Sequence, residues 1–245
     1  MLCCYHLAKF GWKDTILLER DQLTSGTTWH AAGLVSQLGP TAAITKIRKY
    51  TLDLYKKLEK EVDHSAGLRL NGALSIAQNK GRWQELQRQA TTAQLYDVDV
   101  RILDKDQIKK NYPIIETDDV IGGILMPGDG AADPSGVTHM LAKAARLEGA
   151  KIFEQSSVSE ILTKNNKIIK HIFFGHQHIT SSGSYCGITF SSPRSTWSPL
   201  IPNFSNEYRL GTANTDTNYN VAIIRSDALI IHTEDFLKTE VNWFK

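Results

Sequence analysis

The hydrophobic pattern of the first 20 residues predicts a helix followed by a buried strand. Apolar residues recur at helical spacing between residues 2 and 10, and Gly11 suits the position just after a helix end. The run at residues 15–18 does not alternate with polar residues, which favours a strand covered on both faces, as in a parallel sheet. A helix, a glycine turn and a buried strand in this order are typical of the second half of a βαβ unit.

A polar segment and a long amphipathic helix come next. Small and polar residues surround Trp29 and His30 at residues 24–33, which predicts a loop running into a short helix. Residues 42–62 then carry an apolar stripe at steps of three and four residues, which predicts a helix with one buried face. The stripe consists of Ile44, Ile47, Tyr50, Leu54, Leu58 and Val62.

Strands and helices alternate from residue 68 to residue 153. Asp104 and Asp133 each stand where a helix N-cap is expected, and Pro134 occupies the favoured first helical position. The pattern predicts strands at 68–77, 98–103, 120–126 and 151–153, and helices at 81–96, 105–112 and 134–148.

The character of the chain changes near residue 175. A hairpin is expected just before it, with strands at 158–163 and 167–173 around Asn165-Asn166. Residues 176–220 are rich in Ser, Thr, Asn and Pro and show little periodicity, and residues 221–231 fit either a strand pair or a helix. We therefore divide the chain into a domain at 1–175 and a divergent tail at 176–245.

Composition excludes several classes of function. The 245 residues are 41% hydrophobic and 22% charged, which is typical of a folded globular chain. The net charge of +2 provides no strong attraction to nucleic acid or to an anionic membrane, and no apolar stretch reaches the roughly 20 residues that span a bilayer. We expect neither partner, and we find no targeting signal in the sequence.

Glu19 follows the first predicted strand, and this position has a chemical meaning. In a dinucleotide-binding βαβ unit, an acidic residue at the end of the second strand accepts hydrogen bonds from ribose hydroxyls. A solvated strand end is the alternative interpretation of Glu19. The Gly-x-Gly-x-x-Gly turn that should precede the first helix is absent from the sequence. We therefore expect a chain truncated before its first strand and glycine turn.

The string TSGTTWHAAG at residues 24–33 carries a family resemblance. Together with its surroundings at residues 5–38, it resembles the sarcosine and dimethylglycine dehydrogenases, which are FAD-dependent oxidoreductases of the D-amino-acid-oxidase type. The resemblance continues through residues 70–77, Tyr112-Pro113 and the string PGDGAADP at 127–134, and ends near residue 173. It implies an α/β fold: an incomplete FAD-binding Rossmann-like domain with a parallel sheet, plus inserted α+β strands and helices.

The resemblance also implies which residues bind the cofactor. Glu19 and Arg20 would contact the adenosine ribose, and the backbone of Val158 would contact the adenine. Residues 26–34 would wrap the pyrophosphate and the flavin, with His30 bonded covalently to the flavin ring; an ordinary polar loop histidine is the alternative. The implied FAD-binding residues are Glu19, Arg20, Gly26, Thr27, Thr28, Trp29, His30, Ala31, Ala32, Gly33, Leu34 and Val158.

The activity implied is the FAD-dependent oxidative demethylation of a small N-methyl amine, either sarcosine or dimethylglycine. Animal members of the family lie in the mitochondrial matrix and pass electrons to an electron-transfer flavoprotein, and tetrahydrofolate binds a C-terminal domain that this chain lacks. The resemblance also implies a chain truncated at its C-terminal end, because the substrate-contacting residues of relatives fall mostly outside this sequence. No catalytic residue is therefore assigned. The alternatives are an inactive truncated product, a regulatory homologue, or a different amine oxidase of the same superfamily.

Two further sequence features are candidate sites. His171, His176 and His178 cluster in sequence, but no cysteine or suitably spaced carboxylate completes a set of metal ligands, so we predict no metal site. Gly128-Asp129-Gly130 is interpreted either as a loop of the flavin domain or as an ordinary tight turn.

Overall fold

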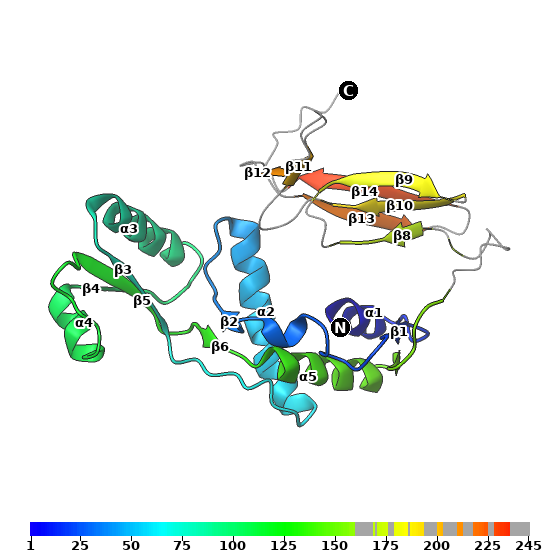
Figure 1. The fold of residues 1–245 in the computed structure, drawn as a ribbon, viewed down its shortest axis with the longest axis horizontal. Coiled ribbons are helices and arrows are strands. Elements are labelled where there is room, and N and C mark those ends of the chain that lie inside the picture. The colour runs from blue at the N-terminus through cyan, green and yellow to red at the C-terminus, as the bar shows by residue number, and fades with distance from the viewer. Residues whose placement is uncertain are drawn as a thin grey trace. The chain divides into compact units, whose positions relative to one another are not determined.

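The computed structural model describes residues 1–159, 169, 171–175, 179–185, 187–193, 200–202, 210–212, 218–224 and 228–235. The chain divides into two compact units, Met1–Ser159 and Glu160–Lys245 (Figure 1). The expected boundary near residue 175 thus falls within the second unit, and the division of function between the two parts stays a prediction.

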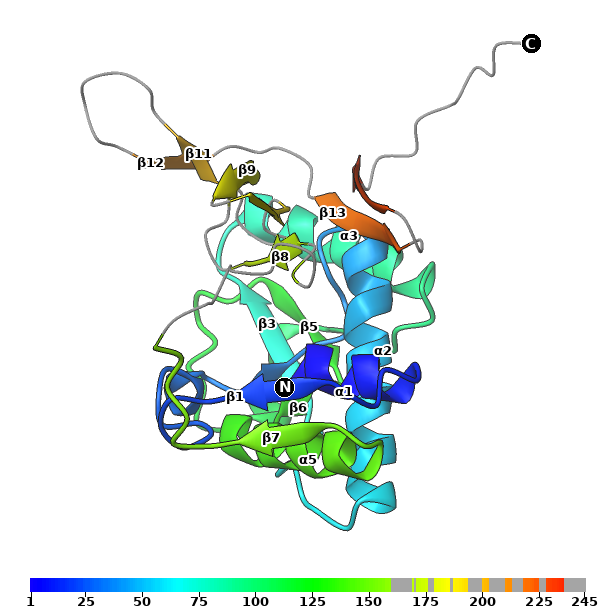
Figure 2. The same ribbon diagram turned by 90° about the vertical axis from the view of Figure 1, so that its right-hand side faces the viewer.

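The first unit is built around a parallel strand pair. β1 (Ile16–Leu18) pairs with β7 (Lys151–Phe153), and α1 (Leu2–Lys9) lies against α5 (Pro134–Leu147) beside them (Figure 2). Gly11 follows α1 with φ of +98°, a left-handed conformation that glycine adopts without strain. The helix, turn and parallel strand predicted from the opening residues are confirmed, and so is the α/β class.

The expectation that β1 is covered on both faces is wrong for the described structure. Leu17 packs against a cluster of buried residues that comes mainly from α1, α2 (Ala42–Glu61) and α5. Ile16 and Leu18, on the other face, are 57% and 50% exposed. The physical reason is the sheet itself: among the described residues β7 is the only strand that pairs with β1, and the core lies on one face of the pair.

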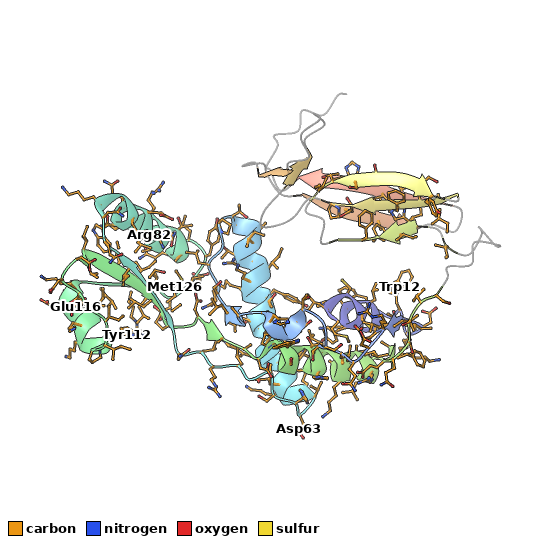
Figure 3. All side chains as sticks on the ribbon, viewed as in Figure 1. Trp12, Asp63, Arg82, Tyr112, Glu116 and Met126 are labelled. Atoms are coloured by element: carbon orange, nitrogen blue, oxygen red, sulfur yellow. The ribbon has the colours of Figure 1, made fainter. Side chains whose placement is uncertain are left out.

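A second layer of the first unit is an antiparallel sheet with strand order β3–β5–β4. Its strands are β3 (Ala73–Ala77), β5 (Gly122–Met126) and β4 (Arg101–Leu103), and α3 (Lys80–Gln94) and α4 (Lys105–Asn111) pack against it. Asp104 forms a capping box with Gln107 at the start of α4. Figure 3 shows side chains filling the space beside these strands, including Met126 at the end of β5.

α2 (Ala42–Glu61) is the long helix expected at 42–62. Ile44, Leu54, Leu58 and Val62 of its predicted stripe are buried. Ile47 and Tyr50 are about half exposed instead, at 48% and 49%, and Leu52 is buried in their place. Tyr50 lies beside α1, where its hydroxyl is 2.7 Å from His6 Nε2, so a polar contact at the surface replaces the expected core contact.

Two short elements connect the layers of the first unit. The single-turn 3₁₀ helix η1 (Thr28–His30) packs against α5, and β2 (Leu34–Val35) pairs antiparallel with β6 (Gly130–Ala131). The predicted loop with a short helix at 24–33 is therefore confirmed, and its end is joined to the turn that precedes α5.

The second unit consists of strands in its described part. β8 (His171–Phe173), β10 (Ile188–Ser192) and β9 (Ser181–Tyr185) form one sheet, β11 (Leu200–Pro202) pairs with β12 (Leu210–Thr212), and β13 (Asn218–Ile224) pairs with β14 (Leu229–Asp235). The pair β13–β14 decides between the two interpretations of residues 221–231. The hairpin expected around Asn165-Asn166 falls mainly on residues outside those described. No helix in the described part of the chain has the length and apolar character to cross a membrane.

Candidate functional site

The ends of β1 and β7 are joined by a set of backbone hydrogen bonds. The N–H of Glu19 donates to the carbonyl of Phe153 at 2.8 Å, and the N–H of Ser156 donates to the carbonyl of Glu19 at 2.9 Å. Val158 follows two residues later and is 60% exposed. The parallel pairing therefore brings the segments of Glu19 and Val158, 139 positions apart in sequence, to the same edge of the sheet.

The Glu19 carboxylate at this edge has acceptor capacity that its protein neighbours do not use. Glu19 Oε1 accepts a hydrogen bond from the N–H of Asp21 at 3.1 Å, and Arg20 forms an exposed ion pair with Asp21 at 2.9 Å. No other side-chain hydrogen bond of Glu19 is formed within the described residues. A partly exposed carboxylate with spare acceptor capacity is suited to accepting bonds from neutral hydroxyl groups.

Glu154 is a residue at this edge that the sequence reasoning missed. Its Oε2 accepts a hydrogen bond from the N–H of buried Leu23 at 2.9 Å, and its Oε1 lies 3.7 Å from Arg146 Nη2. Glu154 therefore ties the segment after β1 to the end of β7. The signal was present in the sequence, because an acidic residue follows each of the two parallel strands.

The turn at η1 presents two aromatic rings. The ring centroids of Trp29 and His30 are 3.7 Å apart with an interplanar angle of 31°, and Trp29 is 59% exposed. The backbone N–H of His30 donates to the carbonyl of Thr27, which closes the turn. The exposed imidazole forms no side-chain hydrogen bond within the described residues, so both of its nitrogens remain accessible to a ligand.

Gly33 joins this loop closely to the segment before α5. Its φ is +70°, and a Cβ at this position would lie 2.2 Å from the carbonyl oxygen of Ala132. The N–H of Ala132 donates to the carbonyl of Gly33 at 2.8 Å, and the β2–β6 pairing follows directly. Gly26 differs, because its φ is not positive and no atom lies within 4 Å of an added Cβ. The space beside Gly26 would let a ligand approach the backbone.

A cavity of about 280 Å³ lies next to the loop that carries His30. Its walls come from the residues after η1, from α2 and from the start of α5, and none of the described residues in them carries a charged side chain. They are Ala31, Gly33, Leu34, Val35, Tyr55, Ala132, Pro134 and Val137. Leu34 is 81% exposed and offers an apolar surface beside the cavity.

Asp129 is a buried carboxylate in the turn between β5 and β6. It accepts hydrogen bonds from Gln37 N at 2.9 Å and Gln37 Nε2 at 3.4 Å. Burial raises the pKa of Asp129, while the two bonds from Gln37 and the nearby charge of Arg48 act in the opposite direction. Arg48 also donates to Ser36 Oγ at 3.0 Å, so the segment after β2 is held from two sides.

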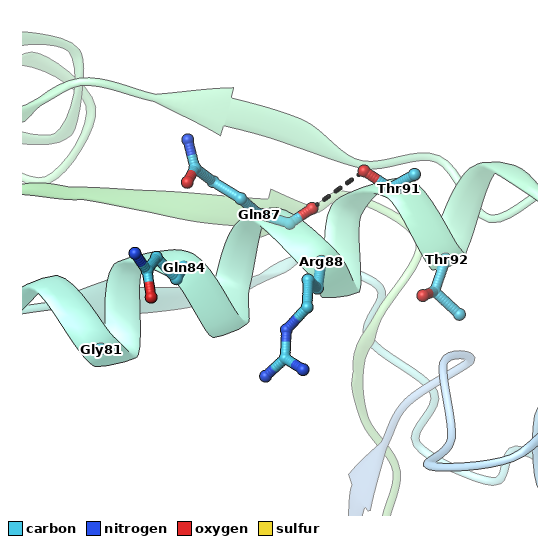
Figure 4. Close-up of a pocket in the computed structure, with 6 residues that line it drawn as sticks. All are labelled: Gly81, Gln84, Gln87, Arg88, Thr91 and Thr92. Atoms are coloured by element: carbon cyan, nitrogen blue, oxygen red, sulfur yellow. Dashed lines mark hydrogen bonds between the residues drawn. The ribbon is translucent and has the colours of Figure 1, made fainter.

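A second cavity is larger but offers no comparable chemistry. Its volume is about 790 Å³, and its described lining comes from one face of α3, as Figure 4 shows. The residues are Gly81, Gln84, Gln87, Arg88, Thr91 and Thr92. The Thr91 hydroxyl already donates to the carbonyl of Gln87 at 3.1 Å. None of these residues belongs to the predicted site.

His171 is the described member of the histidine cluster. Its Nδ1 lies 2.7 Å from Thr189 Oγ1 and its Nε2 lies 2.8 Å from Ser191 Oγ, and burial lowers its pKa. Both nitrogens are therefore engaged by hydroxyl groups. His176 and His178 lie outside the described residues, and the described part holds no group of three metal-ligating side chains.

Comparison with known proteins places these features in context. The family model described as FAD dependent oxidoreductase, DAO, matches residues 1–190. The chain is 39% identical over 158 residues to the mitochondrial sarcosine dehydrogenase of Homo sapiens, which is 64% of this chain and 17% of that protein. It is 34% identical over 162 residues to the mitochondrial dimethylglycine dehydrogenase of Homo sapiens, which is 66% of this chain and 19% of that protein. The chain thus spans less than a fifth of the length of these two relatives.

A solved structure supports the same fold. The L-proline dehydrogenase from P. horikoshii matches with a TM-score of 0.63 and 19% identity, covering 82% of this chain and 63% of that one. At this identity the likeness concerns the fold alone. It agrees with the α/β class and the parallel strand pair seen here.

Proposed function

Since the chain belongs to the DAO family of FAD-dependent oxidoreductases, we propose that it holds FAD covalently through His30 and serves the oxidative demethylation of sarcosine or dimethylglycine. The observation that carries the proposal is the exposed imidazole of His30, which lies against the Trp29 ring in a loop whose following residues line an uncharged cavity. The open space at Gly26 supports the fit, and the close contact of Gly33 with Ala132 fixes the position of the loop.

The other proposed cofactor contacts lie in two regions, the end of β1 and the loop around η1. At the end of β1, the Glu19 carboxylate would accept bonds from ribose hydroxyls, with Arg20 and the backbone of Val158 beside the adenosine. Around η1, the cofactor would be wrapped by Gly26, Thr27, Thr28, Trp29, Ala31, Ala32, Gly33 and Leu34. When bound, FAD supplies the hydride acceptor for oxidation of a C–N bond.

The proposed substrate class and setting rest on the relatives. Both human relatives are dehydrogenases of small N-methyl amines and are named mitochondrial, which supports a mitochondrial location for this chain and, as the finer proposal, the matrix. An electron-transfer flavoprotein is the proposed electron acceptor. We assign no catalytic base to this chain and no tetrahydrofolate to it.

Covalent attachment is tested by expressing the full chain with FAD, denaturing it in acid, and measuring flavin fluorescence on the washed polypeptide. We expect fluorescence with the wild-type chain and none with His30→Gln. His139→Gln is the matched control, because His139 is an exposed histidine on α5 outside the proposed site. Unlabelled wild-type chain, or equal labelling of His30→Gln, would contradict the attachment.

The substrate class needs a separate measurement. Turnover of sarcosine and of dimethylglycine is followed with an artificial electron acceptor, using the flavin-loaded chain. Clear turnover of either amine supports the proposed dehydrogenase. A chain that carries flavin and oxidises neither amine would instead favour the second candidate, a non-catalytic or regulatory member of the family.

A further inference from the structure

Tyr55 is the one described lining residue of the 280 Å³ cavity whose side chain carries a hydroxyl. It lies on α2 between Leu54 and Leu58, which are both buried. Tyr55 packs against the cluster of buried residues to which these two leucines belong. The ring is therefore held by the core, while the residue also borders the cavity. No sequence signal distinguished Tyr55, because it lies outside the expected apolar stripe.

The Tyr55 hydroxyl has unused hydrogen-bonding capacity. Within the described residues it forms no hydrogen bond, and burial raises its pKa because the phenolate would be poorly solvated. No fully buried side-chain polar atom in the described part lacks a partner. The unpaired hydroxyl is therefore not sealed in the core, and the cavity that Tyr55 lines is the open space beside this residue.

The cavity walls indicate what kind of group fits. Its described lining carries no charged side chain, and the nearby N-terminus of α5 is already occupied, because the Asp133 carboxylate accepts bonds from the N–H groups of Ser135 and Gly136. A phosphate would find no counter-charge there. The volume of about 280 Å³ lies just below the roughly 300–1,000 Å³ of small-molecule sites, which suits one ring system better than a whole dinucleotide.

We propose that this cavity receives the isoalloxazine ring of FAD and that the Tyr55 hydroxyl donates a hydrogen bond to an acceptor atom of that ring. The oxidised ring is flat, uncharged and rich in carbonyl and nitrogen acceptors, which matches apolar walls with one hydroxyl donor. The cavity is continuous in sequence with His30 through Ala31, so the attachment residue and the donor flank the same ring. This inference rests on the proposed function and adds to it a contact from α2.

The test compares three ligands on the full chain: riboflavin, which has the ring without phosphates; ADP, which lacks the ring; and FAD. Affinities are measured for wild type, Tyr55→Phe and Tyr50→Phe, before any covalent bond forms. Tyr50→Phe is the matched control, since Tyr50 lies on the same helix with its hydroxyl directed to His6. For a single neutral hydrogen bond we expect Tyr55→Phe to weaken riboflavin and FAD roughly three- to tenfold and to leave ADP unchanged.

Each outcome decides the inference. Unaltered riboflavin affinity in Tyr55→Phe, or a loss that is equal for ADP, overturns the contact with the ring. A fall in the ligand-free melting temperature of Tyr55→Phe also counts against it, because an unpaired hydroxyl should be dispensable for folding. If wild type binds neither riboflavin nor FAD, the proposed function fails together with this inference, whereas binding by wild type with no change in Tyr55→Phe removes this inference alone.

Discussion

In the first unit, close packing restricts which side chain can occupy certain positions. Gly33 combines a positive φ with a contact that leaves no room for a side chain, and Asp129 keeps a carboxylate in the interior by accepting two bonds from Gln37. Gly26 has no positive φ, and no protein atom lies within 4 Å of an added Cβ. These differences make residue-level predictions that need no cofactor.

Replacing Gly33 by Ala should destabilise the chain more than replacing Gly26. The new Cβ would meet the Ala132 carbonyl at 2.2 Å, and L residues also pay a conformational cost at φ of +70°. We expect Gly33→Ala to lower the free energy of unfolding by roughly 1–3 kcal/mol, measured by urea denaturation. Gly26→Ala is the control and should stay within about 0.5 kcal/mol of wild type. Equal effects would contradict the packing described here.

Asp129→Asn should change how stability depends on pH. Because burial raises the pKa of Asp129 in the folded state, the folded chain binds the proton more tightly than the unfolded chain. The stabilisation is complete below the unfolded pKa and is lost as the pH rises through the raised pKa, despite the opposing charge of Arg48. Denaturation between pH 4 and pH 7 should therefore show wild type losing stability relative to Asp129→Asn, which keeps an acceptor for Gln37. A constant difference would mean that Asp129 titrates normally.

The ends of α4 and α5 are determined by residues close to them in sequence. The Asp133 carboxylate accepts bonds from the N–H groups of Ser135 and Gly136, and Pro134 takes the first helical position of α5. The helix is followed by Gly149 with φ of +100°. Asp104 forms the equivalent N-terminal cap of α4. Both helices therefore begin where their sequences predicted.

Asp133→Ala tests how much this cap contributes. Loss of the two hydrogen bonds should cost roughly 0.5–2 kcal/mol of stability, measured by thermal or urea unfolding. Asp118→Ala is the control, since Asp118 is exposed and caps no helix. Because α5 provides Pro134 and Val137 to the cavity, riboflavin affinity should weaken along with stability. A stable variant with no change in unfolding would contradict the role of the cap.

At the scale of the whole molecule, the proposed cofactor site and the main cores belong to the first unit. The three hydrophobic clusters formed by the described residues and both regions of the site lie within residues 1–159. The second unit, in its described part, contributes strand pairs and the hydroxyl-bonded His171. The physical expectation is that the first unit carries cofactor binding without the second.

A chain ending at Ser159 should therefore fold and bind the flavin. We expect its far-ultraviolet circular dichroism to show the helices of the first unit, and its riboflavin affinity to match the full chain within about threefold. The full chain and the His30→Gln variant serve as references. Loss of cooperative unfolding in the shortened chain would show that the second unit contributes to the stability of the first.

The sequence predicted the local elements of this molecule better than it predicted how they pack. The caps at Asp104 and Asp133, the glycine at Gly11 and the order of the longer elements up to residue 153 depend on neighbours a few positions away, and the structure has them as expected. The short strands β2 and β6 were not predicted. The short strands between residues 181 and 212 were not foreseen, because backbone pairing holds polar segments such as β9 that lack apolar alternation.

The sequence by itself determined the helices, the parallel-strand signature and the family resemblance, which the family model matching residues 1–190 confirms. Only the tertiary structure decided that Ile16 and Leu18 are exposed, that Asp129 is buried and that Tyr55 lines a cavity. Backbone conformation responds to the nearest residues along the chain, whereas exposure and hydrogen-bond partners depend on segments brought together from more than 70 positions away, as Tyr55 and Ala132 are at the cavity.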